Sequence, residues 1–162
     1  NYNEGPIAFR YPRGEGTGAE IPTNPEAIEI GKGKIIRNGN DVAILSFGTR
    51  LTESLKAADL LEKEGTSITV ADGRFAKPLD KKLITKLAKT HKLLITIEEG
   101  AIGGFGSHVL QFLTDNNLLD NGLKVKSVCL PDYYIEQNSP DAMYDEAGLT
   151  ARNIVKVIKE SL

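Results

Sequence analysis

The chain has 162 residues, which suits one domain with a hydrophobic core of ordinary size. Its formal net charge of −2 and its interspersed charges argue against a nucleic-acid partner, and no apolar run approaches the roughly 20 residues that span a bilayer. A lone cysteine, Cys129, excludes an internal disulfide and predicts a reducing compartment.

The first 30 residues differ in composition from the rest of the chain. Residues 6–9 are a short apolar run that predicts a strand, and residues 15–26, rich in glycine, proline, threonine and glutamate, predict an ordered linker. The chain lacks an initiator methionine and begins abruptly before this strand, so we expect it to be part of a longer polypeptide. A strand that leads into a linker is expected to belong to a different sheet from the strands that follow.

The main domain begins near Ile30 with two predicted strands, residues 33–37 and 42–47. They flank Asn38-Gly39-Asn40, and an Asn-Gly pair between apolar runs is the strongest short-range signal for a β-hairpin. The first strand is therefore expected to pair antiparallel with the second, at an edge of the sheet.

From residue 51 onward, helical and strand patterns alternate. Strands are predicted at residues 67–71, 93–97 and 125–130. Five helices are predicted: one from Leu51 that is closed by Gly65, one that begins at Asp80, one that ends at about Thr114, and two that follow the N-cap residues Ser139 and Thr150. Such alternation predicts parallel strands with helices on both faces. The expected fold is a three-layer α/β/α sandwich whose five-stranded mixed sheet has four parallel strands and one antiparallel edge strand.

A glycine-rich turn with two adjacent carboxylates, Glu98 and Glu99, follows the apolar run 93–97 and precedes a helix. A strand, a glycine turn and a helix can bind phosphate, but the spacing here gives neither G-x-G-x-x-G nor a P-loop, and both glutamates would repel an anion. We therefore favour a structural or subunit-contact turn. Adjacent residues on an extended strand end point to opposite sides, so the glutamates cannot act as a pair, although one could cap the helix or bind a partner.

Few other side chains suggest chemistry at the carboxyl ends of the strands, where open α/β sheets bind ligands. No Ser-His-Asp arrangement, metal-ligand cluster or cysteine motif is evident there. His91 precedes the strand at 93–97 and is expected at the opposite rim, whereas His108 is expected to be a surface or interface residue. Cys129 lies in an apolar run and is expected to be a buried, inert thiol, and Asp80 is expected to stabilise the first turn of its helix.

Arg13 stands on a constrained turn, Tyr11-Pro12-Arg13-Gly14, outside the main domain. A guanidinium presents a planar fork of donors that suits phosphate or carboxylate. Two interpretations stay open at this level: a substrate-binding arginine, or a salt bridge that holds the linker to a neighbouring domain.

Several segments in this order resemble the C-terminal region of the 1-deoxy-D-xylulose-5-phosphate synthase family. The resemblance covers essentially the whole chain, and the order and spacing of the segments make it specific. The segments that carry it are residues 9–14 (FRYPRG), 30–34 (IGKGK), 43–49 (AILSFGT), 72–80 (DGRFAKPLD), 97–100 (IEEG), 103–107 (GGFGS) and 130–132 (LPD).

This resemblance implies a domain division and a fold. Residues 1–14 would be the last strand and turn of the preceding pyrimidine-binding domain, residues 15–29 a linker, and residues 30–162 a domain like the transketolase C-terminal domain, a five-stranded mixed α/β/α sandwich. Thiamine diphosphate and Mg²⁺ would be bound by the N-terminal domains of the same protein, which this chain lacks. The family's proteins are homodimers in the bacterial cytoplasm or a plastid-type organelle.

The resemblance also implies a reaction and one site residue. The whole protein would condense pyruvate with glyceraldehyde 3-phosphate, releasing CO₂ and forming 1-deoxy-D-xylulose 5-phosphate for isoprenoid and thiamine biosynthesis. Arg13 would bind the phosphate of the aldehyde, and Arg10 would be structural. No residue of this chain matches the family's catalytic, cofactor or metal positions, so the chain alone is expected to be inactive.

Two other interpretations remain open. One is the same domain of transketolase or of the β-subunit of a 2-oxoacid dehydrogenase. The other is a free-standing assembly module that uses the helix after the glycine turn as its contact face.

Overall fold

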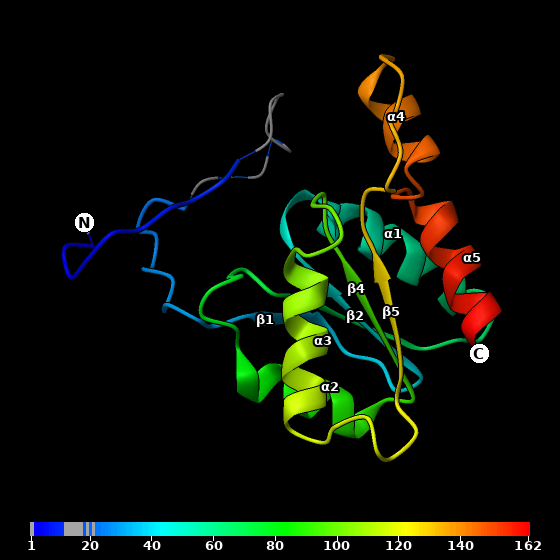
Figure 1. The fold of residues 1–162 in the computed structure, drawn as a ribbon, viewed down its shortest axis with the longest axis horizontal. Coiled ribbons are helices and arrows are strands. Elements are labelled where there is room, and N and C mark those ends of the chain that lie inside the picture. Colours follow the sequence, from blue (N-terminus) through cyan, green and yellow to red (C-terminus); the bar gives the residue numbers. More distant parts are fainter. Residues whose placement is uncertain (1, 12–17, 19, 21) are drawn as a thin grey trace.

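The structure, a computed structural model, describes residues 2–11, 18, 20 and 22–162, and its main body is a five-stranded sheet covered by helices on both faces (Figure 1). The strands are β1 (Lys34–Arg37), β2 (Val42–Ser46), β3 (Ile68–Asp72), β4 (Leu93–Ile97) and β5 (Lys124–Val128). The helices are α1 (Leu51–Glu62), α2 (Lys81–Thr90), α3 (Phe105–Asp115), α4 (Pro140–Glu146) and α5 (Ala151–Ser161), with a 3-10 turn η1 (Gly48–Arg50) before α1. The α/β fold class predicted from the pattern is confirmed.

The strand order is β1-β3-β2-β4-β5, in which β2, β3, β4 and β5 are parallel and β1 is antiparallel to β3. One antiparallel strand therefore lies at an edge, as expected. Its neighbour was predicted wrongly, because β1 pairs with β3 and not with β2. The expected hairpin at Asn38-Gly39-Asn40 does not exist.

The reason is that the segment between β1 and β2 crosses over the beginning of β3. None of residues 38–40 has a positive φ, which the tight type I′ hairpin turn requires. Instead the Gly39 amide donates to the Thr69 hydroxyl, which donates in turn to the Gly39 carbonyl. A side chain at position 39 would collide with the backbone of Ile68, so this glycine serves a close approach and not a turn.

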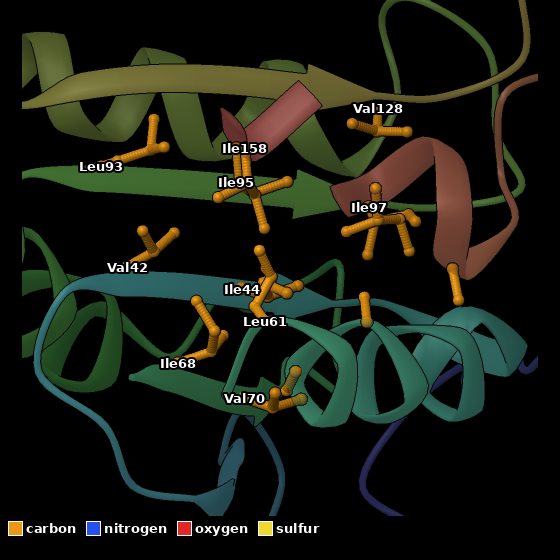
Figure 2. Packing of buried hydrophobic residues seen from close by; sticks show 14 of the residues in the cluster. Val42, Ile44, Leu61, Ile68, Val70, Leu93, Ile95, Ile97, Val128 and Ile158 are labelled. Atoms are coloured by element: carbon orange, nitrogen blue, oxygen red, sulfur yellow. The ribbon is translucent and has the colours of Figure 1, made fainter. Parts of the chain in front are cut away.

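Alternate residues of the central strands point into two separate cores. Val42 and Ile44 of β2 lie in the core under α1 and α5, whereas Ala43 and Leu45 lie in the core under α2 and α3. Figure 2 shows the first core, where Ile44 and Ile95 of adjacent strands meet Leu61 of α1 and Ile158 of α5. Every residue of β2 and β4 is buried, as expected for strands covered on both faces.

The helix starts predicted from the sequence are confirmed, but one helix is capped by a different side chain. Asp80 and Ser139 are N-cap residues whose side chains accept hydrogen bonds from Leu83 and Ala142. Thr150 precedes α5 as expected, but its hydroxyl donates to Asp145 and does not cap the helix. The Glu53 carboxylate, on α1, accepts the Ala151 amide instead at 2.8 Å.

The N-terminal segment leaves the sandwich as an extended chain (Figure 1). Residues 2–11 form neither helix nor strand within the described part of the chain, and Phe9 and Tyr11 are 80% and 82% exposed. The assignment of residues 1–14 to a preceding domain stays a prediction. No helix among the described residues is long and apolar enough to cross a bilayer.

Candidate functional site

The carboxyl ends of the four parallel strands form a rim that carries the polar turns expected from the sequence. Residues 48–50 follow β2, residues 72–74 end and follow β3, residues 98–100 follow β4, and residues 129–132 follow β5. In α/β folds this rim is where ligands bind. Its two glutamates face opposite sides of the sheet, so the chemistry of each side is separate.

Glu98 points to the side of α3 and is only 6% exposed. Its Oε1 accepts a hydrogen bond from the Gly106 amide at 2.8 Å, in the first turn of α3. A carboxylate at this position satisfies a free amide and lies at the positive end of the helix dipole. The place where a phosphate would bind is therefore filled by the protein's own carboxylate, and the prediction that a glutamate could cap this helix is confirmed.

Glycines of the turn allow close approach, Gly100 and Gly104 to the Glu98 side chain and Gly106 to the side chains of β4 and β5. A Cβ on Gly104 would be 2.5 Å from Glu98 Oε2, and one on Gly106 would be 2.7 Å from Thr96 Oγ1. Contacts this short cannot be accommodated without moving the helix or the carboxylate. The glycines of this turn thus leave room for the buried Glu98 carboxylate. This role was not apparent from the sequence.

Glu99 points to the other side of the sheet and joins a cluster with Thr49, Arg50 and Tyr144. Its Oε1 lies 2.8 Å from Arg50 Nε and accepts from the Thr49 hydroxyl. The Arg50 Nε–H is not aligned for a hydrogen bond, so this contact is an ion pair. The Arg50 guanidinium also lies 3.8 Å from the centre of the Tyr144 ring, a cation–π distance.

The cluster fixes α4 to the rim. Burial, and secondarily the charge and hydrogen bond of Glu99, raise the pKa of the Tyr144 hydroxyl, which therefore stays protonated and can donate. Arg50 and Tyr144 are not apparent as site residues from the sequence. Arg50 comes directly after a strand end, but nothing in the spacing connects it to Glu99 or Tyr144, because they are 49 or more residues away.

The surroundings of the two histidines and of the cysteine do not support a catalytic role for these side chains. His91 is at the opposite rim, where its Nε2 contacts the Thr69 hydroxyl at 2.8 Å and the Gly39 carbonyl at 3.3 Å. His108 on α3 is half-buried, and its side chain forms no hydrogen bond with the described residues. Burial, followed by the charge of Glu98, raises the pKa of the half-buried Cys129 thiol, which keeps it protonated.

The remaining candidates have structural roles or cannot be placed. Asp80 accepts the Leu83 amide at 2.9 Å and the Gly33 amide at 3.0 Å, so it ties the chain before β1 to α2. Arg13 lies outside the described residues, and Arg10 is exposed. No cluster of three potential metal ligands is found in the described part of the chain.

Comparison with known proteins agrees with this architecture. A family model described as "Transketolase, C-terminal domain" matches residues 31–154. A solved structure described as "Split gene transketolase, inactive beta4 tetramer" is similar, with a TM-score of 0.75 and 32% sequence identity over 83% of this chain. The match covers 43% of that chain, so this chain spans less than half the length of that relative. The chain belongs to the transketolase C-terminal domain family.

Proposed function

We propose that this chain is the C-terminal part of a thiamine-diphosphate-dependent transferase, 1-deoxy-D-xylulose-5-phosphate synthase. The whole protein would condense pyruvate with glyceraldehyde 3-phosphate and release CO₂. Membership of the transketolase C-terminal domain family carries the general proposal. The narrower choice of reaction is supported by the residues that resemble the synthase family, above all residues 9–14 and 72–80.

Within that protein the chain would act in assembly and would not catalyse the reaction alone. The observation that supports this role is that both rim glutamates are already engaged within the chain, Glu98 by Gly106 and Glu99 by Arg50. A carboxylate held in this way is poorly placed to move protons for a substrate. The solved relative is described as inactive in an assembly of its own copies, which agrees with this proposal.

The N-terminal segment would belong to the preceding pyrimidine-binding domain. Ile7, Phe9 and Tyr11 are all more than half exposed, and large apolar side chains gathered in one extended segment need a covering partner. In this proposal residues 1–14 complete that domain, residues 15–29 link the two, and a second copy of the protein completes a homodimer.

Thiamine diphosphate and Mg²⁺ would be held by the other domains, because the described residues do not fit them. A diphosphate would be expected to bind at the N-terminus of α3, but the Glu98 carboxylate already accepts a hydrogen bond there. The described residues also contain no cluster of metal ligands. This chain would therefore supply no ligand to the cofactor or to the metal ion.

Arg13 is the residue proposed to bind substrate. The turn Tyr11-Pro12-Arg13-Gly14 would present a guanidinium to the phosphate of glyceraldehyde 3-phosphate. A charge-assisted bidentate contact of this kind is stronger than a neutral hydrogen bond and selects a phosphorylated aldehyde over an unphosphorylated one.

The test uses Arg13→Ala in the full-length enzyme, with Arg10→Ala as the matched control because it removes a guanidinium three residues away. We expect Arg13→Ala to raise KM for glyceraldehyde 3-phosphate by about 10-fold to 100-fold, the effect of losing a charged hydrogen bond. Decarboxylation of pyruvate should persist, and Arg10→Ala should leave KM nearly unchanged. An unaltered KM in Arg13→Ala would remove this residue from the site.

The second candidate function is that of a transketolase, favoured by the description of the solved relative. Product analysis separates the two. Formation of 1-deoxy-D-xylulose 5-phosphate from pyruvate and glyceraldehyde 3-phosphate by the full-length protein supports the first proposal. Transfer of a ketol group between sugar phosphates, without that product, supports the second.

A further inference from the structure

A hollow of about 340 Å³ opens beside the first turn of α3, at the rim of the sheet. We call it the Glu98 hollow. Its walls come from the turn after β4, the start of α3, β5 and the loop that follows β5. The lining residues used below are Glu98, Ile102, Ser127, Cys129, Leu130 and Pro131.

The charge in this hollow is incompletely compensated. Glu98 is only 6% exposed, and its Oε1 has the Gly106 amide as partner, whereas no described residue donates a hydrogen bond to Oε2. No lysine or arginine of the described residues forms an ion pair with Glu98. An ionised carboxylate has about four acceptor positions, and a buried one is stabilised strongly by a cation.

The other walls of the Glu98 hollow suit the aliphatic part of an arginine or lysine side chain. Leu130 and Pro131 contribute apolar surface, and Ile102 stands at the hollow with 74% of its surface exposed. Arginine and lysine place their methylene groups along apolar surface while the charged end reaches a polar partner. A carboxylate behind an apolar wall is therefore matched to a cationic side chain more closely than to a small inorganic ion.

We propose that the Glu98 hollow binds a guanidinium or ammonium group on an aliphatic stem, supplied by an arginine or lysine of the polypeptide that covers this rim. The match covers 43% of the solved relative, and in the proposed function the chain is one part of a longer protein whose other polypeptide would cover this surface. The exposed Ile102 beside the buried charge offers apolar surface on which the stem of such a side chain can pack. The source of the cation depends on the proposed function, whereas the binding chemistry of the hollow does not.

The first test is a titration of the isotope-labelled chain with ethylguanidinium and with ethylurea, its uncharged counterpart of the same shape. The amide resonances of Gly106 and Cys129 report on the hollow. We expect ethylguanidinium to shift them saturably, with an affinity at least about 10-fold greater than that of ethylurea. Equal binding of the two probes, or no binding of either, overturns the proposal.

Variants test whether Glu98 is the carboxylate that binds the charged probe. Glu98→Gln keeps an oxygen to accept the Gly106 amide but removes the charge, so the preference for ethylguanidinium should vanish. Glu99→Gln, whose side chain lies on the opposite side of the sheet, should retain it. If Glu98→Gln does not fold, Ile102→Lys serves instead, because the exposed position tolerates a change and the new ammonium should occupy the hollow and exclude the probe. Retained binding in either variant counts against the proposal.

The second test concerns the whole protein. Glu98→Gln in the full-length enzyme should weaken the association of its parts or subunits at least about 10-fold by sedimentation, with a smaller dependence on salt than in wild type. A normal association together with ethylguanidinium binding would show a site whose cation is not supplied by this protein, and would overturn the assignment to a covering side chain. Neither result bears on which reaction the enzyme catalyses, so the proposed function is tested separately by its products.

Discussion

Glu53 and Ala151 are 98 residues apart in the sequence, yet the Glu53 carboxylate accepts the Ala151 backbone amide at 2.8 Å. The contact caps α5 with a side chain of α1. It thereby fixes the two helices that cover one face of the sheet.

This contact predicts a dependence of stability on pH. Burial alone would raise the pKa of Glu53, but the hydrogen bonds from Lys56 and Ala151 outweigh it and hold the pKa below the ordinary value of 4.5. A carboxylate with a lowered pKa contributes stability above its unfolded-state pKa, and that contribution is lost as the pH falls through the folded-state pKa. We expect Glu53→Gln to cost about 1 kcal/mol at pH 7 and to flatten the loss of stability below about pH 4.5.

Urea unfolding followed by circular dichroism at pH 7, 4.5 and 3 measures this effect. Glu160→Gln is the control, because Glu160 is an exposed carboxylate on α5 and its loss should change the free energy of unfolding by less than about 0.5 kcal/mol. Parallel pH profiles for wild type and Glu53→Gln would show that the cap contributes nothing.

Gly106→Ala should destabilise the chain although alanine is the better helix former. A Cβ at this position would lie 2.7 Å from Thr96 Oγ1 and 2.9 Å from Ser127 Oγ, so α3 would have to move away from the sheet. We expect the overpacking to exceed the gain in propensity of about 1 kcal/mol and to give a net loss of about 1–2 kcal/mol. Gln111→Ala, on the exposed face of the same helix, should be neutral. A stabilised Gly106→Ala would mean that the helix is not held against β4 and β5.

Arg50 and Tyr144 should be energetically coupled. The guanidinium lies 3.8 Å from the ring centre, and Glu99 holds it in place. A double-mutant cycle with Arg50→Met and Tyr144→Leu should give a coupling of about 1 kcal/mol, since the side chain of Arg50 is largely buried. Additive effects of the two substitutions would contradict the interaction.

The same cluster predicts a local change in dynamics. Glu99→Gln removes the charge that positions Arg50, so the amides of residues 140–147 should exchange with solvent several-fold faster than in wild type. Amides in β4 should be unaffected, because that strand is paired on both sides by β2 and β5. Hydrogen exchange followed by mass spectrometry distinguishes this local loosening from a global loss of stability.

Ile95→Ala should be among the most destabilising single substitutions. Ile95 is fully buried in the interior strand β4, in the core beneath α1 and α5. We expect a loss of about 3–4 kcal/mol from the lost burial and the cavity that remains. Ile36→Ala, on the edge strand β1 with 40% of its side chain exposed, should cost far less in the same urea titration. Similar losses for both would indicate that Ile95 is not packed in the core as the structure places it.

The sequence by itself determined the elements and much of their polarity. A continuous apolar run identified β4 as a buried strand, and Asp80 and Ser139 marked helix starts, because these signals depend on residues a few positions apart. The two-residue period of a strand also determined that Glu98 and Glu99 diverge. These features are local, so the chain carries them without reference to the rest of the fold.

Only the tertiary structure decided which distant elements meet. The Asn38-Gly39-Asn40 stretch suggested a hairpin, but β3 lies between β1 and β2 because the Gly39 backbone packs on Ile68 and bonds to Thr69. Likewise, the cap on α5 comes from α1, and Arg50 meets partners that follow it by 49 and 94 positions. Such contacts arise when the sheet assembles and brings its strand ends together, and no local pattern in the sequence records which side chains become neighbours there.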